Sequence, residues 1–413
     1  MPIFNSFTLL LLLCAFFGYI NSRFVRLPPT LGFMVGSLFL SIFLLVLQAL
    51  DISFAADLIE RLHGIDFSKT VLYGILSFLL FAGALQFNVA ELAKERWLIL
   101  TLSTCSVIIA TLVVGALMTV VFMLFGFSIP WPYAFLFGAL ISPTDPVIII
   151  GLFKGAKGDQ PLKMTISGEA LFNDGAAIIL FVVLLAIVNA QGIEFGQIAY
   201  LLLRQVLGSV LLGLGLGWLT HRLISKTTQL SLQTLISLGF VAGGYDLALL
   251  FGTSGPIAIV IAGLFVRNYR SHGASGPLAR HNLYRIWGVI DEFLNAALFV
   301  LMGFEILTLP SSWALWGAGL LAIAVVLFGR FASLFIPIGA IPSFKARAMG
   351  AVPLLTWAGL RGGISLALAL SLPEGAAHNI ILCSTYVVVL FSTLVQGLTV
   401  KKFINRGDCK SPV

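Results

Sequence analysis

The sequence predicts an all-helical protein that crosses a lipid bilayer many times. Of its 413 residues, 59% are hydrophobic and only 10% are charged, and the mean hydropathy is +1.05. Water-soluble domains carry roughly 25% charged residues. Apolar runs of about 20 residues recur from one end of the chain to the other, the length that a helix needs to cross the hydrocarbon core. The composition therefore indicates a polytopic α-helical membrane protein.

Hydropathy and helix breakers divide the chain into about thirteen membrane spans. We expect them at approximately 4–20, 29–49, 69–88, 98–125, 132–153, 163–189, 197–220, 229–250, 254–268, 285–307, 311–338, 348–371 and 379–399. The first segment is as apolar as a signal peptide but lacks a basic start and a clear cleavage site, so we expect it to remain as a membrane helix. Because the connections are short, residues 1–413 are interpreted as one membrane domain without a soluble regulatory domain.

The positions of the basic residues predict the orientation in the membrane. Nearly all Lys and Arg residues fall in alternate loops, and only Arg61 and Lys69 fall in the loops of the opposite side. Because basic loops stay in the cytoplasm, we expect the N-terminus outside and the C-terminus inside a plasma or inner membrane. The net charge of +7 is then explained by anchoring at the inner leaflet, and no nucleic-acid partner is expected.

Neither a cofactor nor catalytic chemistry is indicated. The four cysteines and five histidines show no spacing typical of a disulfide or a metal site. There is also no GxxxxGK[ST] run that would bind ATP. We therefore expect a transporter driven by ion gradients rather than an enzyme, with no cofactor apart from the transported ions.

The predicted span 132–153 contains a break at its centre. Pro143 and Pro146 flank Thr144 and Asp145, and each proline removes a backbone donor and disfavours helix at the residue before it. Broken backbone at this depth is tolerated only inside protein or against water, and transporters use it to coordinate ions. The alternative is a simple proline kink that holds a buried, protonated Asp145.

The predicted span 163–189 carries polar side chains in the sequence GEALFNDG. Glu169 and Asn173 are four residues apart and share one helix face, and Asp174 lies about 100° further round. Ionisable residues inside a membrane are costly and usually functional. Asp174 is therefore the best candidate for a carboxylate that holds either one cation or one proton, and the alternative is a structural hydrogen-bond cluster between helices.

A second break is predicted in the span 348–371. Gly362 and Gly363 follow Arg361 and weaken the helix. A carboxylate or a set of carbonyl groups must hold Arg361, which cannot deprotonate. Arg330, one span earlier, poses the same question, and Glu169 can pair with either arginine. Since the breaks lie in the fifth and twelfth spans, they indicate a transport site built from inverted repeats.

Three motifs together resemble the NhaP-type sodium/proton antiporters of the cation:proton antiporter superfamily. They are SPTDPV at 142–147, GEALFNDG at 168–175 and GLRGGISLAL at 359–368. Their order, spacing and thirteen-span setting match those of the family. The resemblance implies unwound, crossing fifth and twelfth helices and a homodimer. It also implies core-type helices at approximately 69–189 and 285–399, with the other helices forming a dimer-interface bundle.

The resemblance also implies the roles of individual residues. The family's Asn–Asp pair falls on Asn173 and Asp174, a pattern associated with electroneutral one-for-one exchange. Its second aspartate falls on Asp145, with Thr144 lending a carbonyl group, so Na⁺ would bind at Asp174 and Asp145. The structural ion-pair residues of the family fall on Glu169, Arg330 and Arg361.

Two positions depart from the family pattern. Ala82 replaces an acidic residue that relatives often carry, and Ala170 replaces a common serine, although Gln86 could compensate for the first change. The resulting prediction is exchange of a monovalent cation (Na⁺, with Li⁺ and K⁺ as alternatives) for protons by alternating access, serving pH homeostasis. Two other functions stay open at this point: a passive cation channel, and a transport-dead sensor or scaffold on the same fold.

Overall fold

The computed structural model is helical throughout the residues that it describes, which are 2–52, 58–59, 62, 66–87, 89–145, 147, 160–189, 195–268, 277–310 and 312–400. The helices are α1 (Pro2–Ile20), α2 (Pro29–Ala49), α4 (Phe67–Lys69), α5 (Leu76–Ala84), α6 (Val89–Leu92), α7 (Arg96–Leu124), α8 (Trp131–Ile141), α10 (Gln160–Asn189), α11 (Phe195–Leu203), α12 (Ser209–Ser225), α13 (Leu230–Leu250), α14 (Gly255–Asn268), α15 (Pro277–Phe304), α16 (Trp313–Ala340), α17 (Pro342–Ala348), α18 (Val352–Trp357), α19 (Gly363–Leu370) and α20 (Ala376–Phe391). Short π-helical or 3-10 turns extend or join them: η1 (Asn21–Val25), η2 (Thr70–Ile75), η3 (Arg204–Gly208), η4 (Glu305–Thr308), η5 (Met349–Ala351) and η6 (Ser392–Gln396).

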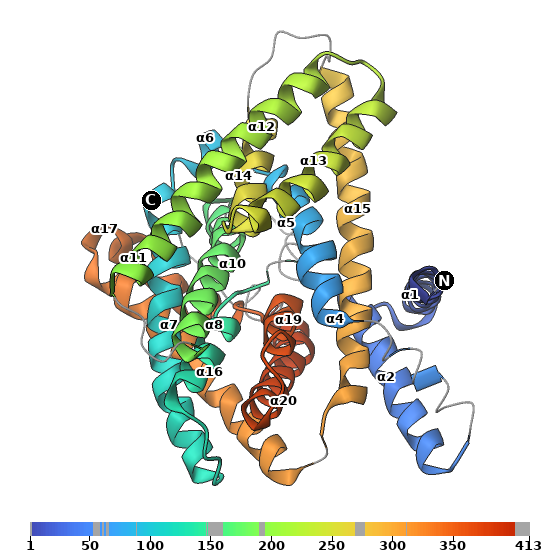
Figure 1. The fold of residues 1–413 in the computed structure, drawn as a ribbon, viewed down its shortest axis with the longest axis vertical. Coiled ribbons are helices and arrows are strands. Elements are labelled where there is room, and N and C mark those ends of the chain that lie inside the picture. Colours follow the sequence, from blue (N-terminus) through green and yellow to red (C-terminus); the bar gives the residue numbers. More distant parts are fainter. Residues whose placement is uncertain are drawn as a thin grey trace.

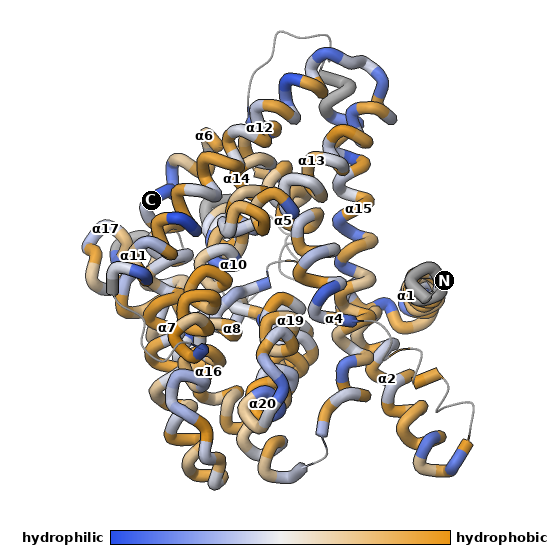
Figure 2. Tube along the Cα trace, viewed as in Figure 1, coloured by the Kyte–Doolittle hydropathy of each residue, from blue (hydrophilic) through white to orange (hydrophobic). Residues whose placement is uncertain are grey.

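The predicted all-helical membrane fold is confirmed. Within the described part of the chain, nine helical segments are long and apolar enough to cross a bilayer. The other four predicted spans correspond to α8, α14, α15 and the broken pair α18–α19. Hydrophobic residues follow the helices along most of their length, and hydrophilic residues gather near the top of the view, around the ends of α12 and α15 (Figure 2).

The helices pack in two groups (Figure 1). In the first group, which we call the site bundle, α7 packs against α8, α10 and α16, while α20 packs against α16 and α19. In the second bundle, α14 packs against α5, α12 and α13, and α15 packs along α2 and α5. Helices α5 and α15, which occupy the predicted spans 69–88 and 285–307, make their most extensive contacts in the second bundle.

Small residues allow the helices of each bundle to approach closely. A side chain at Gly138 of α8 would lie 2.6 Å from the carbonyl oxygen of Thr111 in α7, and one at Gly213 of α12 would lie 2.5 Å from that of Ala258 in α14. Such contacts between backbones are typical of membrane helices, which gain little from hydrophobic burial against one another. In addition, the Ser106 hydroxyl donates a 3.0 Å hydrogen bond to Ser333, linking α7 to α16.

The site bundle contains two similar sets of three helices. Helices α7, α8 and α10 form one set, and α16, α18–α19 and α20 form the other, with α7 packed along α16. In each set the middle helix is interrupted: α8 ends at Ile141, and α18 and α19 are separated by residues 358–362. The two breaks that the sequence predicted in the fifth and twelfth spans therefore occupy corresponding positions.

Candidate ion-binding site

The first break presents Asp145 to the second broken helix. Beyond the end of α8, Ser142–Asp145 are not helical, and the backbone N–H of Asp145 donates a 2.7 Å hydrogen bond to the carbonyl of Leu360. The Asp145 Oδ1 atom accepts a 2.9 Å hydrogen bond from the backbone N–H of Val147. The two interrupted segments thus meet through their backbones, and the carboxylate of Asp145 lies at their junction.

The second break leaves room for this carboxylate because it is built from glycine. A Cβ atom at Gly362 would lie 2.6 Å from Asp145 Oδ2, a distance shorter than Cβ atoms show to their neighbours in real proteins. At the next position, a Cβ on Gly363 would collide with the side chain of Leu298 in α15. A larger residue at either position would therefore push the two broken helices, or the bundle behind them, apart.

Helix α10 supplies the polar face that the sequence predicted. The buried Asn173 side chain donates a 2.7 Å hydrogen bond from Nδ2 to Thr144 Oγ1. Its Oδ1 atom is buried and has no hydrogen-bond partner among the described residues. Asp174 is also buried and lies within electrostatic range of Asp145. Thr144, Asp145, Asn173 and Asp174 are thus brought together, with carboxylate and amide oxygens free to accept a cation or a proton.

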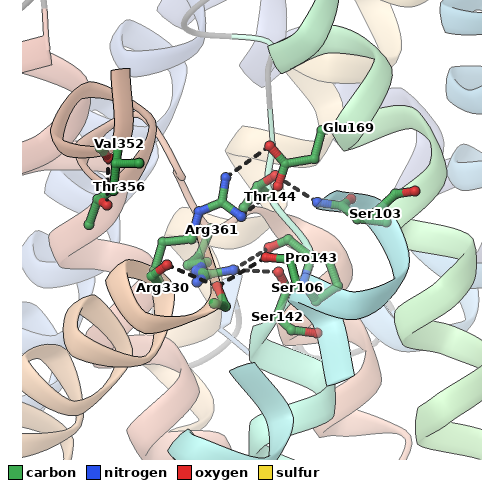
Figure 3. A network of polar contacts seen from close by, with 12 residues as sticks. Ser103, Ser106, Ser142, Pro143, Thr144, Glu169, Arg330, Val352, Thr356 and Arg361 are labelled. Atoms are coloured by element: carbon green, nitrogen blue, oxygen red, sulfur yellow. Dashed lines mark hydrogen bonds and ion pairs between the residues drawn. The ribbon is translucent and has the colours of Figure 1, made fainter. Parts of the chain in front are cut away.

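Glu169 pairs with Arg330 rather than with Arg361, which the sequence alone did not decide. The guanidinium of Arg330 donates from both terminal nitrogens to the two carboxylate oxygens of Glu169, at 2.5 and 3.1 Å. Figure 3 shows the two side chains among their polar neighbours. Both residues are at most 6% exposed at their side chains. Such a two-point contact fixes the orientation of the charges as well as their distance.

Arg361 is held by carbonyl groups, which was the other arrangement that the sequence left open. Its guanidinium donates to the carbonyl oxygens of Ser142 and Pro143 at 2.5 and 3.0 Å, beside the end of α8 (Figure 3). These carbonyls belong to the residues that the break frees from helix bonding. The C-terminal end of a helix carries partial negative charge, so α8 and its break neutralise part of the charge of Arg361.

Two residues of the last span, which the sequence analysis missed, support the second break. The Ser392 hydroxyl accepts a 2.9 Å hydrogen bond from the backbone N–H of Arg361 and donates one of 2.6 Å to Gln396 Oε1. Gln396 Nε2 in turn donates to the carbonyl of Trp357 at 3.0 Å. Polar residues four positions apart in an apolar span were the available signal, since they share one helix face.

A small cavity adjoins the first break. Its lining includes Thr144, Asp145, Glu169, Ala170 and Arg330. One of the two departures from the family pattern, Ala170, therefore lies directly at the candidate site.

The remaining positions named by the sequence analysis lie elsewhere. Ala82 is buried in the apolar cluster of α5. Gln86, which was considered as a compensating ligand, is exposed beyond the end of that helix. Pro146 lies outside the described residues. Within the described residues, no group of three or more His, Cys, Asp or Glu side chains is placed to hold a metal ion.

Known proteins with similar sequences include sodium/proton antiporters, which agrees with a candidate ion site. Residues 11–406 match the family model described as "Sodium/hydrogen exchanger, transmembrane". The chain is 38% identical over 401 residues to the Na⁺/H⁺ antiporter NhaP of Pseudomonas aeruginosa, covering 96% of this chain and 95% of the relative. It is 32% identical to the Na⁺/H⁺ antiporter NhaH of Halobacillus aidingensis, covering 82% and 83% of the two chains.

The fold also matches that of a solved structure. The sodium/proton antiporter MjNhaP1 of Methanocaldococcus jannaschii superimposes with a TM-score of 0.76, covering 98% of this chain and 99% of the other at 18% identity. At that identity the match concerns the fold alone.

Proposed function

Because the chain belongs to the sodium/hydrogen exchanger family, we propose that it exchanges Na⁺ for protons across the membrane at Asp145 and Asp174. The observation that carries the proposal is the meeting of two broken helices around buried acidic and amide oxygens. Backbone freed from helix bonding and hard oxygen ligands are what a small monovalent cation needs. Thr144 and Asn173 complete the proposed site, because their mutual hydrogen bond leaves Asn173 Oδ1 free.

The charges around the breaks support one-for-one exchange. Three carboxylates (Asp145, Glu169 and Asp174) and two guanidiniums (Arg330 and Arg361) surround the junction, and the Glu169–Arg330 pair is closed by direct contact. One negative charge is left over, and either one Na⁺ or one proton neutralises it. An unneutralised charge at this depth is costly, so the neutral loaded states are favoured and the two ions compete.

We infer that alternating access comes from movement of the site bundle against the second bundle. Leu298 of α15, which touches Gly363 of α19 beside the candidate site, lies where the two bundles meet. Rearrangement there would expose the site to one side of the membrane and then to the other, as transporters built from inverted repeats do.

We further infer the orientation and assembly. Basic residues such as Lys94, Arg222 and Lys226 lie in or directly beside the loops expected in the cytoplasm, which supports an N-terminus outside and a C-terminus inside a plasma or inner membrane. Exposed apolar side chains along α12, including Leu211 and Trp218, form a face for lipid or for a second copy of the chain. We propose a homodimer through the second bundle, which cross-linking in native membranes would test.

The direct test is a transport assay with the purified protein in liposomes that hold a pH gradient and an internal pH-sensitive dye. We expect added Na⁺ to dissipate the gradient without net current, and Asp174→Ala to abolish this effect. Asp246→Ala, which removes an exposed carboxylate from α13 in the second bundle, is the matched control and should retain exchange. Flux that carries current without a requirement for protons would indicate a channel, and absence of flux with Na⁺, Li⁺ and K⁺ would indicate a transport-dead protein.

A further inference from the structure

The last span carries a stripe of hydrogen-bonding side chains beside the second break. Ser392 and Gln396 of η6 and Thr399 after it are spaced four and three residues apart, so they share one helix face. Ser392 accepts a 2.9 Å hydrogen bond from the backbone N–H of Arg361. Gln396 Nε2 donates to the carbonyl of Trp357 at 3.0 Å, and Thr399 accepts the Trp357 indole N–H at the same distance. Since Trp357 ends α18 and Arg361 precedes α19, the stripe contacts the chain on both sides of the break.

The two backbone groups that Ser392 and Gln396 hold are helix partners that the break has separated. In a continuous α-helix, the N–H of Arg361 would donate to the carbonyl of Trp357, four residues earlier. Instead, the Arg361 N–H donates to the Ser392 hydroxyl, which donates at 2.6 Å to Gln396 Oε1. Gln396 Nε2 then donates to the Trp357 carbonyl. The two side chains therefore bridge a broken helical hydrogen bond.

Burial and hydrogen-bond chemistry fix the direction of this bridge. Ser392, Gln396 and Arg361 are at most 3% exposed. A hydroxyl carries one proton, and an amide has one accepting and one donating end. Because Ser392 gives its proton to Gln396, its lone pairs are left to accept the Arg361 N–H. The donating end of the amide is then left for the Trp357 carbonyl. Backbone groups that leave a helix inside a membrane need such partners.

The local sequence does not by itself keep this helix interrupted. Residues 357–363 read WAGLRGG and contain no proline, unlike the first break. A glycine costs a helix about 1 kcal/mol relative to alanine, whereas a proline costs about 3 kcal/mol and removes a donor. The backbone can therefore close the bond between Arg361 and Trp357, and the contacts with Ser392 and Gln396 favour the interrupted form.

The stretch held in this way carries the contacts to the first break. The carbonyl of Leu360 accepts the N–H of Asp145. The guanidinium of Arg361 donates to the carbonyls of Ser142 and Pro143. Closing the helical bond would rotate the backbone at Leu360 and Arg361 and displace both contacts. The arrangement of oxygens around Asp145 therefore depends on the bridge.

We propose that Ser392 and Gln396 are positioning residues that hold the second break open and thereby set the affinity of the Asp145–Asp174 site for Na⁺. They act through the backbone of Arg361. The proposal rests on the antiport function proposed above. Without the bridge, the chain between α18 and α19 shifts toward a continuous helix, and Na⁺ meets a displaced set of oxygens.

The test measures Na⁺-dependent exchange by the full-length protein in liposomes, with KM and the maximal rate determined separately. Ser392→Ala removes the hydroxyl that joins Arg361 to Gln396. We expect KM for Na⁺ to rise about ten-fold, equivalent to about 1.4 kcal/mol of lost binding, and the maximal rate per folded protein to change much less. A purely structural role would lower the maximal rate with the amount of folded protein and leave KM unchanged, and that outcome would overturn the proposal.

Ser384→Ala is the matched control. Ser384 is a buried serine of α20, eight residues before Ser392, and its hydroxyl has no hydrogen-bond partner among the described residues. Its loss should leave KM unchanged. An equal rise of KM in Ser384→Ala and Ser392→Ala would count against the bridge, because the effect would then belong to any buried serine of this helix.

Gln396→Met breaks the bridge from its other end and carries the test if Ser392→Ala does not fold. KM should again rise about ten-fold. Because the two residues form one bridge, the double variant should raise KM by about ten-fold and not by the product of about a hundred-fold that independent sites give. Multiplied effects would contradict a single bridge. Wild-type exchange is measured first, because its absence would count against the antiport function rather than against the bridge.

Discussion

The two broken helices meet at one point, but different residues interrupt them: proline in the first and glycine in the second. The break after α8 follows the pattern of a proline interruption, and its carbonyl groups at Ser142 and Pro143 accept hydrogen bonds from Arg361. The break between α18 and α19 is built from glycine, and Gly362 gives space to the carboxylate of Asp145. The proline break therefore supplies the acidic residue and the acceptors, whereas the glycine break supplies the basic residue and the space.

This difference makes each break dependent on the other. The N–H of Asp145 donates to the carbonyl of Leu360, and the guanidinium of Arg361 donates back to the first break. Backbone groups that leave a helix inside a membrane must find partners in the protein. Each interruption supplies hydrogen-bond partners to the other, so the crossing of the two segments stabilises both breaks.

The two buried arginines differ in the same way. Arg330 faces the carboxylate of Glu169, a full and permanent opposite charge, whereas Arg361 faces carbonyl dipoles. Because the charges of Glu169 and Arg330 neutralise each other, we expect the geometry of this pair to change little when the transported ion binds. Arg361 is connected by backbone to Gly362 and thereby to Asp145, so its position can follow the occupancy of the site.

The largest expected effect comes from breaking the closed ion pair. We expect Glu169→Gln to lower the free energy of unfolding by about 3–5 kcal/mol, because it leaves the buried charge of Arg330 without compensation. The measurement is the unfolding temperature of the purified protein in detergent, compared with the wild type. If the pair is as closed as its geometry indicates, the loss should change little with the Na⁺ concentration.

The double variant Glu169→Leu with Arg330→Met is the control for this prediction. Replacing both members of a buried pair by apolar residues is often neutral or stabilising, so the double variant should regain most of the lost stability. A Glu169→Gln protein that unfolds at the wild-type temperature would contradict the assignment of a structural role to this pair.

A smaller effect on stability and a larger one on transport are expected from the glycine break. An added methyl group at Gly362 would lie 2.6 Å from Asp145 Oδ2, and overpacking of this kind costs about 1–3 kcal/mol. We expect Gly362→Ala to reduce Na⁺-dependent exchange by at least about ten-fold, the factor that 1.4 kcal/mol represents. Gly350→Ala, at an exposed glycine with open space around it, should leave exchange unchanged. Wild-type exchange in Gly362→Ala would show that the two breaks are not in tight contact.

The sequence predicted the breaks well because prolines, glycines and intramembrane charges act locally. A helix break at Pro143 or Gly362 and a charge at Asp145 can be recognised from a few neighbouring residues. Apolar runs likewise show where the spans lie. The partner of Glu169 could not be predicted in this way, since Arg330 and Arg361 lie in neighbouring spans and both can reach the same depth. Only the packing of α10 against α7 and α8, and of α16 against α7, decides between them.

Other parts of the arrangement were harder to predict for the same reason. The order of spans along the chain does not say which helices are neighbours. Ser392 and Gln396 did carry a local signal, but four-residue spacing alone does not show that a backbone N–H needs an acceptor.

The smallest effect is expected from a change at Ala170, where this chain departs from the family pattern beside the acidic residues of the junction. Ala170 lines the cavity beside Thr144 and Asp145, so Ala170→Ser would place one more oxygen close to the proposed ion. A neutral hydrogen-bonding or ligand group contributes about 0.5–1.5 kcal/mol, which corresponds to roughly a two- to ten-fold lower KM for Na⁺. The liposome assay at a fixed pH measures this change. Ala82→Ser adds the same hydroxyl inside the apolar cluster of α5 and should not lower KM. If Ala170→Ser leaves KM unchanged while remaining folded, the ion does not use this side of the cavity, and its ligands come from Asp174 and the crossing backbones alone.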